Sequence, residues 1–134
     1  MHSDSIDTNI IVHGIIKDIP GQRELAHRLL NTEGVIHHLS ISAIVESIYV
    51  FEKLYHKSRE EIGELMLFFL TRYSDVLIYD HKLVEQTFLM WLSHPKLSFV
   101  DCLLSKEAEI KHAEPLYTFD KKLATQSKPA KLLA

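Results

Sequence analysis

The sequence predicts an α/β fold with a mainly parallel sheet and helices on both of its faces. Short apolar, β-branched runs alternate along the chain with longer segments of helical periodicity. Glycine and proline are scarce, with four of each, so the chain has few long loops. Strands that are separated by helices are joined by right-handed crossover connections, and such connections produce parallel pairing.

Length and composition predict one domain spanning residues 1–134, with a core of about 5–125 and a weakly patterned tail at 126–134. Apolar residues make up 46% of the chain and charged residues 25%, as in ordinary globular proteins. No apolar run reaches the roughly 18 residues of a membrane span, and the N-terminus lacks the layout of a signal peptide. We therefore expect a cytoplasmic protein that has no membrane association.

The first part of the chain is predicted to form a strand followed by two helices. The strand ends at 5–7, and a helix follows over about 8–17 until Pro20 and Gly21 interrupt it. Helical spacing of apolar residues predicts the second helix over about 22–33. The residues expected on its apolar face are Leu25, Leu29 and Leu30.

Gly34 is expected to end this second helix, because glycine commonly follows a helix C-terminus. The β-branched segment 35–41 predicts a buried strand, and Ser42 is expected to cap the helix after it. The apolar face of that helix is expected to comprise Ile44, Val45, Ile48, Phe51 and Tyr55. A Ser-Arg-Glu-Glu capping box opens a further helix over 58–73.

The second half continues the alternation of strands and helices. The expected elements are a strand at 76–79, a helix from Asp80 to just before Pro95, a helix at 98–113, a strand at 115–119 and a helical turn from Asp120. A fifth, edge strand is possible near 131–133. The predicted sheet therefore has four or five strands.

Four acidic residues lie at or near the places where predicted strands are followed by helices: Asp7, Glu46, Asp101 and Asp120. In parallel α/β sheets, ligands bind beyond the carboxyl ends of the strands. Clustered carboxylates repel each other unless a cation intervenes. Oxygen ligands without a thiolate favour Mg²⁺ or Mn²⁺, which can activate water and neutralise the charge of a phosphodiester.

Helix capping is a competing explanation for three of these acids, because Asp accepts backbone N–H bonds at helix N-termini. The three are Asp7, Asp101 (in a Ser98-x-x-Asp101 capping box) and Asp120. Glu46 lies among apolar helix positions, where an unpaired acid would be costly. A salt bridge with Lys53, or a solvent-facing stripe shared with Val50, would account for Glu46 without a metal.

The number of cysteines, the positions of the histidines and the net charge argue against other kinds of site. Cys102 is the only cysteine, so an intrachain disulfide is impossible, and we expect it to be a small buried residue. The nine histidines are scattered, and each is expected to be exposed or half-buried. A net charge of −3 argues against coating nucleic acid by bulk electrostatics, but it is compatible with a nuclease.

Four segments together resemble the acidic motifs of PIN-domain ribonucleases, most closely the short VapC-like toxins of toxin–antitoxin pairs. They are Ile6-Asp7-Thr8-Asn9-Ile10, Ser40 to Glu46, Phe99-Val-Asp101-Cys-Leu-Leu, and Leu116-Tyr-Thr-Phe-Asp120-Lys-Lys-Leu. They occur in the family's order between Ile6 and Leu123. The resemblance implies a three-layer α/β/α domain that acts as a metal-dependent endoribonuclease.

The same resemblance implies roles for individual residues. Asp7, Glu46, Asp101 and Asp120 would ligate Mg²⁺ or Mn²⁺ or orient the attacking water. Asn9 and Thr118 would support these ligands by hydrogen bonding. Family members often form homodimers, and the toxins are inhibited by a small antitoxin protein.

Other residues have plainer interpretations. Lys121 and Lys122 can contact RNA phosphates or can simply be solvated helix charges. Five large apolar residues at helical spacing favour a core or a dimer surface over a platform for stacking bases: Phe68, Phe69, Phe88, Leu89 and Trp91.

Two other classes of function remain open. A catalytically silent PIN-like module that binds RNA or protein would have no need of all four acids. Phosphatases of the haloacid-dehalogenase type need an Asp-x-Asp pair after the first strand, where this chain has Asp7-Thr8-Asn9. Response-regulator receivers need adjacent acids near the first strand, which this chain lacks.

Overall fold

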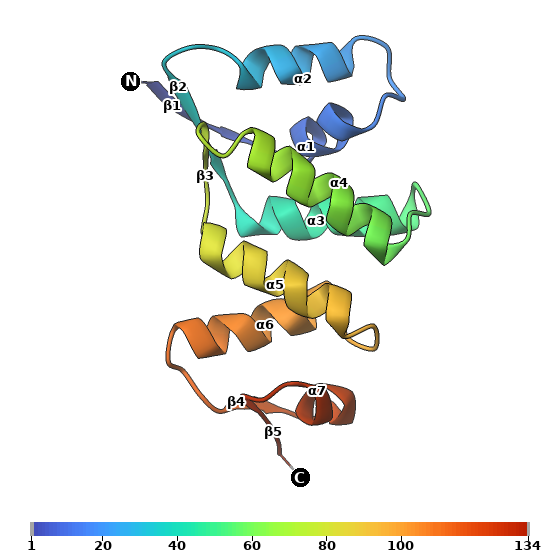
Figure 1. Ribbon diagram of the computed structural model, residues 1–134, viewed down its shortest axis with the longest axis vertical. Helices are drawn as coiled ribbons and strands as arrows, with labels where there is room; N and C mark the ends of the chain where they lie inside the picture. The colour runs from blue at the N-terminus through green and yellow to red at the C-terminus, as the bar shows by residue number, and fades with distance from the viewer. Residues whose placement is uncertain (1, 134) are drawn as a thin grey trace. The chain divides into compact units, whose positions relative to one another are not determined.

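The computed structural model describes residues 2–133, and the chain divides into two compact units, Met1–Tyr79 and Asp80–Ala134. Figure 1 shows the elements of each unit in order along the chain. The mixed α/β class predicted from the sequence is confirmed, with parallel sheets of three and two strands in the described residues. That all of these strands belong to one sheet in a single domain stays a prediction.

The first unit contains a three-stranded parallel sheet. Its strands β1 (His2–Ile6), β2 (Val35–Leu39) and β3 (Leu77–Ile78) are ordered β1-β2-β3. Helices α1 (Thr8–Ile15) and α2 (Gln22–Leu30) connect β1 to β2, and α3 (Ile41–Lys53) and α4 (Arg59–Arg72) connect β2 to β3. Both connections step in the same direction across the sheet, so right-handed crossovers place all four helices on one face.

The core of the first unit lies between this face and the helices. Ile6 and Leu39 are opposite each other on β1 and β2, and both are buried, as is Leu77 on β3. The helices contribute Ile11, Ala26, Leu30, Ile44, Ile48, Phe51, Ile62, Met66 and Phe69. Gly14 lets α1 approach α4 closely, because a Cβ at this position would lie 3.0 Å from Cε2 of Phe69.

His37 is a correction to the expectation that every histidine is exposed or half-buried. It is fully buried on β2, on the same face as Leu39, and its Nδ1 is paired with the carboxylate of Asp4 on β1. Alternation along a strand places residues two apart on one face, so His37 shares the buried side with its apolar neighbours. The other eight histidines are exposed or half-buried, as predicted.

The second unit consists of a helical pair followed by a small parallel β-α-β element. Its helices are α5 (His81–Ser93), α6 (Phe99–Ile110) and α7 (Lys121–Gln126), and its strands β4 (Leu116–Thr118) and β5 (Ala130–Leu132) pair in parallel. Phe88, Trp91 and Phe99 form an aromatic cluster between α5 and α6, with ring centroids 4.9 to 6.1 Å apart. The tail, for which the sequence allowed either a short strand or a frayed end, forms strand β5 beside β4.

Helix starts agree with prediction more often than helix ends. The capping box of Ser58 and Glu61 is present, and Asp80 caps α5 as expected. The third helix is capped by Ser40 rather than Ser42, because β2 ends at Leu39 and Ser40 already accepts a hydrogen bond from the backbone N–H of Ser42.

The predicted apolar face and end of the second helix are also corrected. Helix α2 ends at Leu30, and Gly34 (φ +75°) instead lies in the turn before β2. Ala26 and Leu30 form its buried face, whereas Leu25 is 59% exposed. Ala26 packs beside Gly14 of α1, and Leu25, its neighbour in the chain, faces outward.

Large apolar side chains that are exposed, rather than buried in the cores, bear on whether the protein binds partner proteins. Cys102, Phe69, Phe88 and Trp91 are buried, as predicted for core residues. Phe68 is 70% exposed and Leu89 59% exposed. Along residues 2–133, no helix combines the length and the apolar character that crossing a membrane requires.

Candidate functional site

Asp7 lies at the carboxyl end of β1, where the chain turns into α1. Its extended backbone (φ −101°) makes it the N-cap, and its Oδ1 accepts the backbone N–H of Asn9 at 3.0 Å. The side chain is exposed. The cap explains why an Asp fits this position, since it satisfies a backbone donor that the helix itself cannot satisfy.

Glu46 lies in the second turn of α3 and is linked to the first residue of α1. The Thr8 hydroxyl donates to its Oε2 at 3.0 Å, and Thr8 is itself buried. Glu46 is exposed, so the burial cost that its apolar neighbours suggested does not arise. Thr8 thus brings the Asp7 turn and Glu46 together beyond the carboxyl ends of β1 and β2.

Asp101 is the third residue of α6 and forms a reciprocal capping box with Ser98. Its Oδ2 accepts the Ser98 backbone N–H at 3.2 Å, and the Ser98 hydroxyl accepts the Asp101 backbone N–H at 3.1 Å. The capping interpretation is confirmed for this residue. The hydrogen bond from the Ser98 N–H uses Oδ2 of Asp101, so Oδ1 takes no part in the cap.

Asp120 follows β4 and caps α7. Its Oδ1 accepts the backbone N–H groups of Lys122 at 2.8 Å and Leu123 at 3.2 Å. The Thr118 hydroxyl accepts the Asp120 backbone N–H at 2.9 Å. Lys121 and Lys122 are both exposed at the start of α7.

The donor set suits a hard divalent cation in its chemistry, because it consists of carboxylate oxygens with nearby hydroxyl and amide groups. Each cap uses one oxygen of its Asp, and a carboxylate can accept through both. In the part of the chain that is described, no three His, Cys, Asp or Glu side chains gather into a group that could hold a metal. The structure thus bonds Glu46 to Thr8, the residue after Asp7, in the first unit, and places Asp101 and Asp120 at helix starts in the second.

A groove of about 460 Å³ borders Asp7 between α1 and α2. Asp7, Asn9 and His13 line it from the first helix, and Gln22, Leu25 and Leu29 line it from the second. Asp7 and Asn9 were predicted as site residues from the sequence, whereas no role in a site was predicted for His13 and Gln22. Leu25 and Leu29 were expected on the apolar face of α2, and in the structure they form the wall of this open groove.

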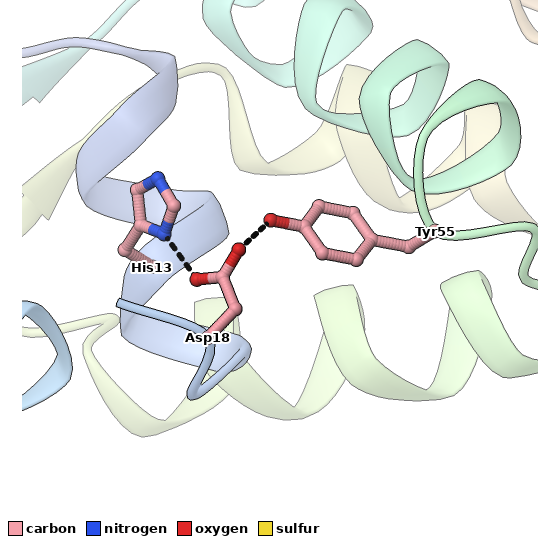
Figure 2. Close-up of polar contacts among 3 residues, drawn as sticks. All are labelled: His13, Asp18 and Tyr55. Atoms are coloured by element: carbon pink, nitrogen blue, oxygen red, sulfur yellow. Dashed lines mark hydrogen bonds and ion pairs between the residues drawn. The ribbon is translucent and has the colours of Figure 1, made fainter. Parts of the chain in front are cut away.

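His13 belongs to a hydrogen-bonded group that sequence patterns did not indicate. Figure 2 shows Asp18 between His13 and Tyr55. His13 Nδ1 lies 2.9 Å from Asp18 Oδ1, and the Tyr55 hydroxyl donates to Asp18 Oδ2. The Tyr55 hydrogen bond holds the pKa of Asp18 below its ordinary value, with a smaller contribution from His13, and the same bond raises the pKa of Tyr55.

The only signal for this group in the sequence is the spacing of His13 and Asp18, five residues apart across a helix end. Tyr55 lies 37 residues after Asp18, so the tertiary fold alone brings it into contact. Comparison of the chain with models of known protein families found no match, and comparison with curated proteins found none either.

Proposed function

We propose that the protein is a Mg²⁺- or Mn²⁺-dependent endoribonuclease with a PIN-like fold. The observation that carries the proposal is the hydrogen bond to Glu46 from Thr8, the residue next to Asp7, beyond the carboxyl ends of two parallel strands. This is the edge at which α/β sheets bind ligands. The four acidic motifs in PIN-like order support it further, as does the parallel pairing of both sheets.

The fold that accompanies this proposal is a three-layer α/β/α domain with one sheet of four or five strands. Asp7, Glu46, Asp101 and Asp120 are the proposed ion ligands, with Asn9 and Thr118 in support. A bound ion supplies an activated water and neutralises phosphodiester charge. Lys121 and Lys122 are exposed beside Asp120, and we assign them to contacts with RNA phosphates.

The biological setting that we propose is that of a cytoplasmic toxin held inactive by a small antitoxin protein, with the toxin acting as a homodimer. This setting follows from the likeness of the four acidic motifs to those of VapC-like toxins. Co-purification of the chain with a small protein encoded beside it, and the mass of the isolated chain in solution, test these two associations separately.

The experiment that tests the activity is cleavage of a mixed RNA pool by purified protein with Mg²⁺, with Mn²⁺ or with EDTA. Wild type is compared with Asp7→Asn and with Asp75→Asn, a matched change at an exposed Asp in the turn before β3. We expect metal-dependent cleavage by wild type and Asp75→Asn, and loss of at least about 100-fold in Asp7→Asn. Cleavage by Asp7→Asn at the wild-type rate would remove Asp7 from the site.

A catalytically silent PIN-like module that binds RNA or protein is the second candidate. The observation in its favour is that Asp7, Asp101 and Asp120 each act as a helix cap, which accounts for these residues without a metal. Stable binding of RNA without cleavage, by folded protein in either metal, would select this candidate.

A further inference from the structure

We propose that the groove between α1 and α2 binds one nucleobase of single-stranded RNA, and that His13 contacts this base while Asp18 and Tyr55 position the imidazole. The proposal rests on the proposed ribonuclease function and names a substrate subsite next to Asp7. It concerns a hydrogen-bonded group outside the four acidic motifs, and a groove that shares only Asp7, Asn9 and Ile10 with the first of them.

The chemistry of the groove lining favours a base over a phosphate. Among the residues that the structure describes, no lysine or arginine lines the groove, and Asp7 contributes a carboxylate there. A phosphate would be repelled by this carboxylate. Asn9 and Gln22 instead offer amide donors and acceptors, which can pair with the polar edge of an unstacked base.

The apolar part of the groove suits the flat face of the same base. Leu25 is 59% exposed, and Leu29 is half-buried beside it on α2. An exposed leucine in a groove loses water contacts when a base packs against it. The volume of about 460 Å³ lies within the range of small-ligand sites, which is about 300–1,000 Å³.

His13 is held in a defined orientation at this groove. An ionised Asp18 can only accept, so His13 Nδ1 is the donor in their 2.9 Å hydrogen bond. The opposite nitrogen, Nε2, points away from Asp18 (Figure 2) and in the neutral ring is an acceptor. Tyr55 holds the second oxygen of Asp18, so the carboxylate is fixed from both sides.

The binding test uses a fluorescently labelled single-stranded oligoribonucleotide in EDTA, so that cleavage does not interfere. His13→Gln and Leu25→Ser are compared with His2→Gln and Leu54→Ser, which alter an exposed histidine and a 70% exposed leucine outside the groove. We expect both groove variants to bind about five- to tenfold more weakly than wild type, and the two controls to bind as wild type.

Competition identifies the part of RNA that the groove recognises. Free ribonucleosides should displace the labelled strand from wild type and lose this ability with Leu25→Ser, whereas inorganic phosphate should not. Equal affinity of groove variants and controls, failure of wild type to bind, or displacement by phosphate but not by nucleosides would each overturn the proposal. Selective displacement by an amphipathic peptide would also overturn it and assign the groove to a protein partner.

The positioning role of Asp18 has a spectroscopic readout that a purely structural role would not change. The ¹⁵N shifts of the His13 ring should report a proton on Nδ1 in wild type and a mixture of tautomers in Asp18→Asn, with recovery in Asp18→Glu. An unchanged tautomer in Asp18→Asn would remove Asp18 from this role.

The subsite and the ribonuclease proposal can fail independently. RNA cleavage that depends on Asp7, together with equal RNA binding by groove variants and controls, would overturn the subsite alone. Weaker binding by the groove variants, without cleavage by wild type in any metal, would support the subsite and overturn the ribonuclease.

Discussion

Asp18 and Tyr55 connect two loops of the first unit through a single hydrogen bond. Asp18 follows α1 and Tyr55 follows α3, and the hydroxyl of the tyrosine donates to the carboxylate. Hydrogen bonding to a charged carboxylate favours its ionised form, and the same bond favours the protonated form of the tyrosine. The pKa of Asp18 is therefore lowered and that of Tyr55 raised.

Tyr55→Phe should raise the pKa of Asp18 toward its ordinary value, because Tyr55 is the main cause of the shift. The folded pKa of Asp18 lies below the unfolded value of about 3.9, so its contribution to stability is present above that pH. It is lost as pH falls through the folded pKa. NMR titration of the Asp18 carboxyl carbon measures the change, and Tyr117→Phe, at an exposed tyrosine, should leave it unaltered.

The contribution of Tyr55 to stability depends on pH in the opposite direction. Because the folded pKa of Tyr55 is above about 10, its contribution is fully present below pH 10 and is lost as pH rises through the folded pKa. An Asp18 titration that is identical in wild type and Tyr55→Phe would contradict the hydrogen bond.

His37→Leu should be neutral or should stabilise the protein by up to about 1 kcal/mol. Within residues 2–133, Nε2 of this buried ring has no hydrogen-bond partner, so the substitution removes an unsatisfied polar atom. Asp4 is partly exposed and can be solvated instead. Urea unfolding measures the difference.

Asp4→Ala is the informative comparison for His37. It leaves the buried ring without the carboxylate, and removal of one partner of a buried polar group costs about 1–3 kcal/mol. If Asp4→Ala were no more destabilising than His37→Leu, the Asp4 pair would not be what satisfies His37.

At the scale of the helix and strand, starts were predictable because their signals are local. Ser58, Asp80, Ser98 and Asp120 each bond a backbone N–H two or three residues later, so the sequence alone contains the whole interaction. Helix ends carry weaker local signals. The Asn31 side chain donates to the His27 carbonyl, and helix α2 stops at Leu30 rather than continuing to Gly34.

The contacts of the candidate site also separate into local ones, which were predictable, and long-range ones, which were not. The caps of Asp7, Asp101 and Asp120 follow from short motifs and were predicted. The Thr8–Glu46 bond spans 38 residues, and the bond between Tyr55 and Asp18 spans 37. No periodicity or local spacing encodes such contacts, so the groove could not be recognised from the sequence.

Ser98→Ala tests whether Asp101 has a role besides capping. Loss of the hydroxyl should destabilise the protein by about 1 kcal/mol and leave RNA cleavage within about twofold of wild type. Asp101→Asn should abolish cleavage with a smaller change in stability, because an Asn oxygen can still accept the Ser98 N–H. Thermal unfolding and cleavage are measured side by side, with Ser74→Ala, at an exposed serine, as the control. Equal cleavage by Asp101→Asn and Ser98→Ala would reduce Asp101 to a cap.

At the scale of the whole molecule, both parallel sheets follow the topology that right-handed crossovers favour. The proposed single sheet requires pairing between strands that are far apart in the chain. Such pairing is a long-range property, which local hydrophobic periodicity does not specify. The parallel direction of the strands could therefore be predicted from the sequence, but their complete order could not.

Mg²⁺ or Mn²⁺ should raise the melting temperature of the wild-type protein, because a ligand of the native state stabilises it. Asp7→Asn should reduce or abolish this response, since it removes one charged ligand. In the absence of metal the same variant should be as stable as wild type or more stable, because the repulsion between carboxylates is relieved. Differential scanning calorimetry with and without metal measures both effects, and Asp75→Asn should retain the full response. A full metal response in Asp7→Asn would exclude this residue as a principal ligand.

The close approach of α1 to α4 at Gly14 affects which mutations the protein tolerates. A side chain at position 14 would press on the Phe69 ring and displace α1, the helix that Asp7 caps and that carries His13. A random-mutagenesis screen for inactive but well-expressed clones should therefore recover bulky replacements at Gly14 alongside changes in the acids. Such clones would map to a glycine that has no reactive group of its own.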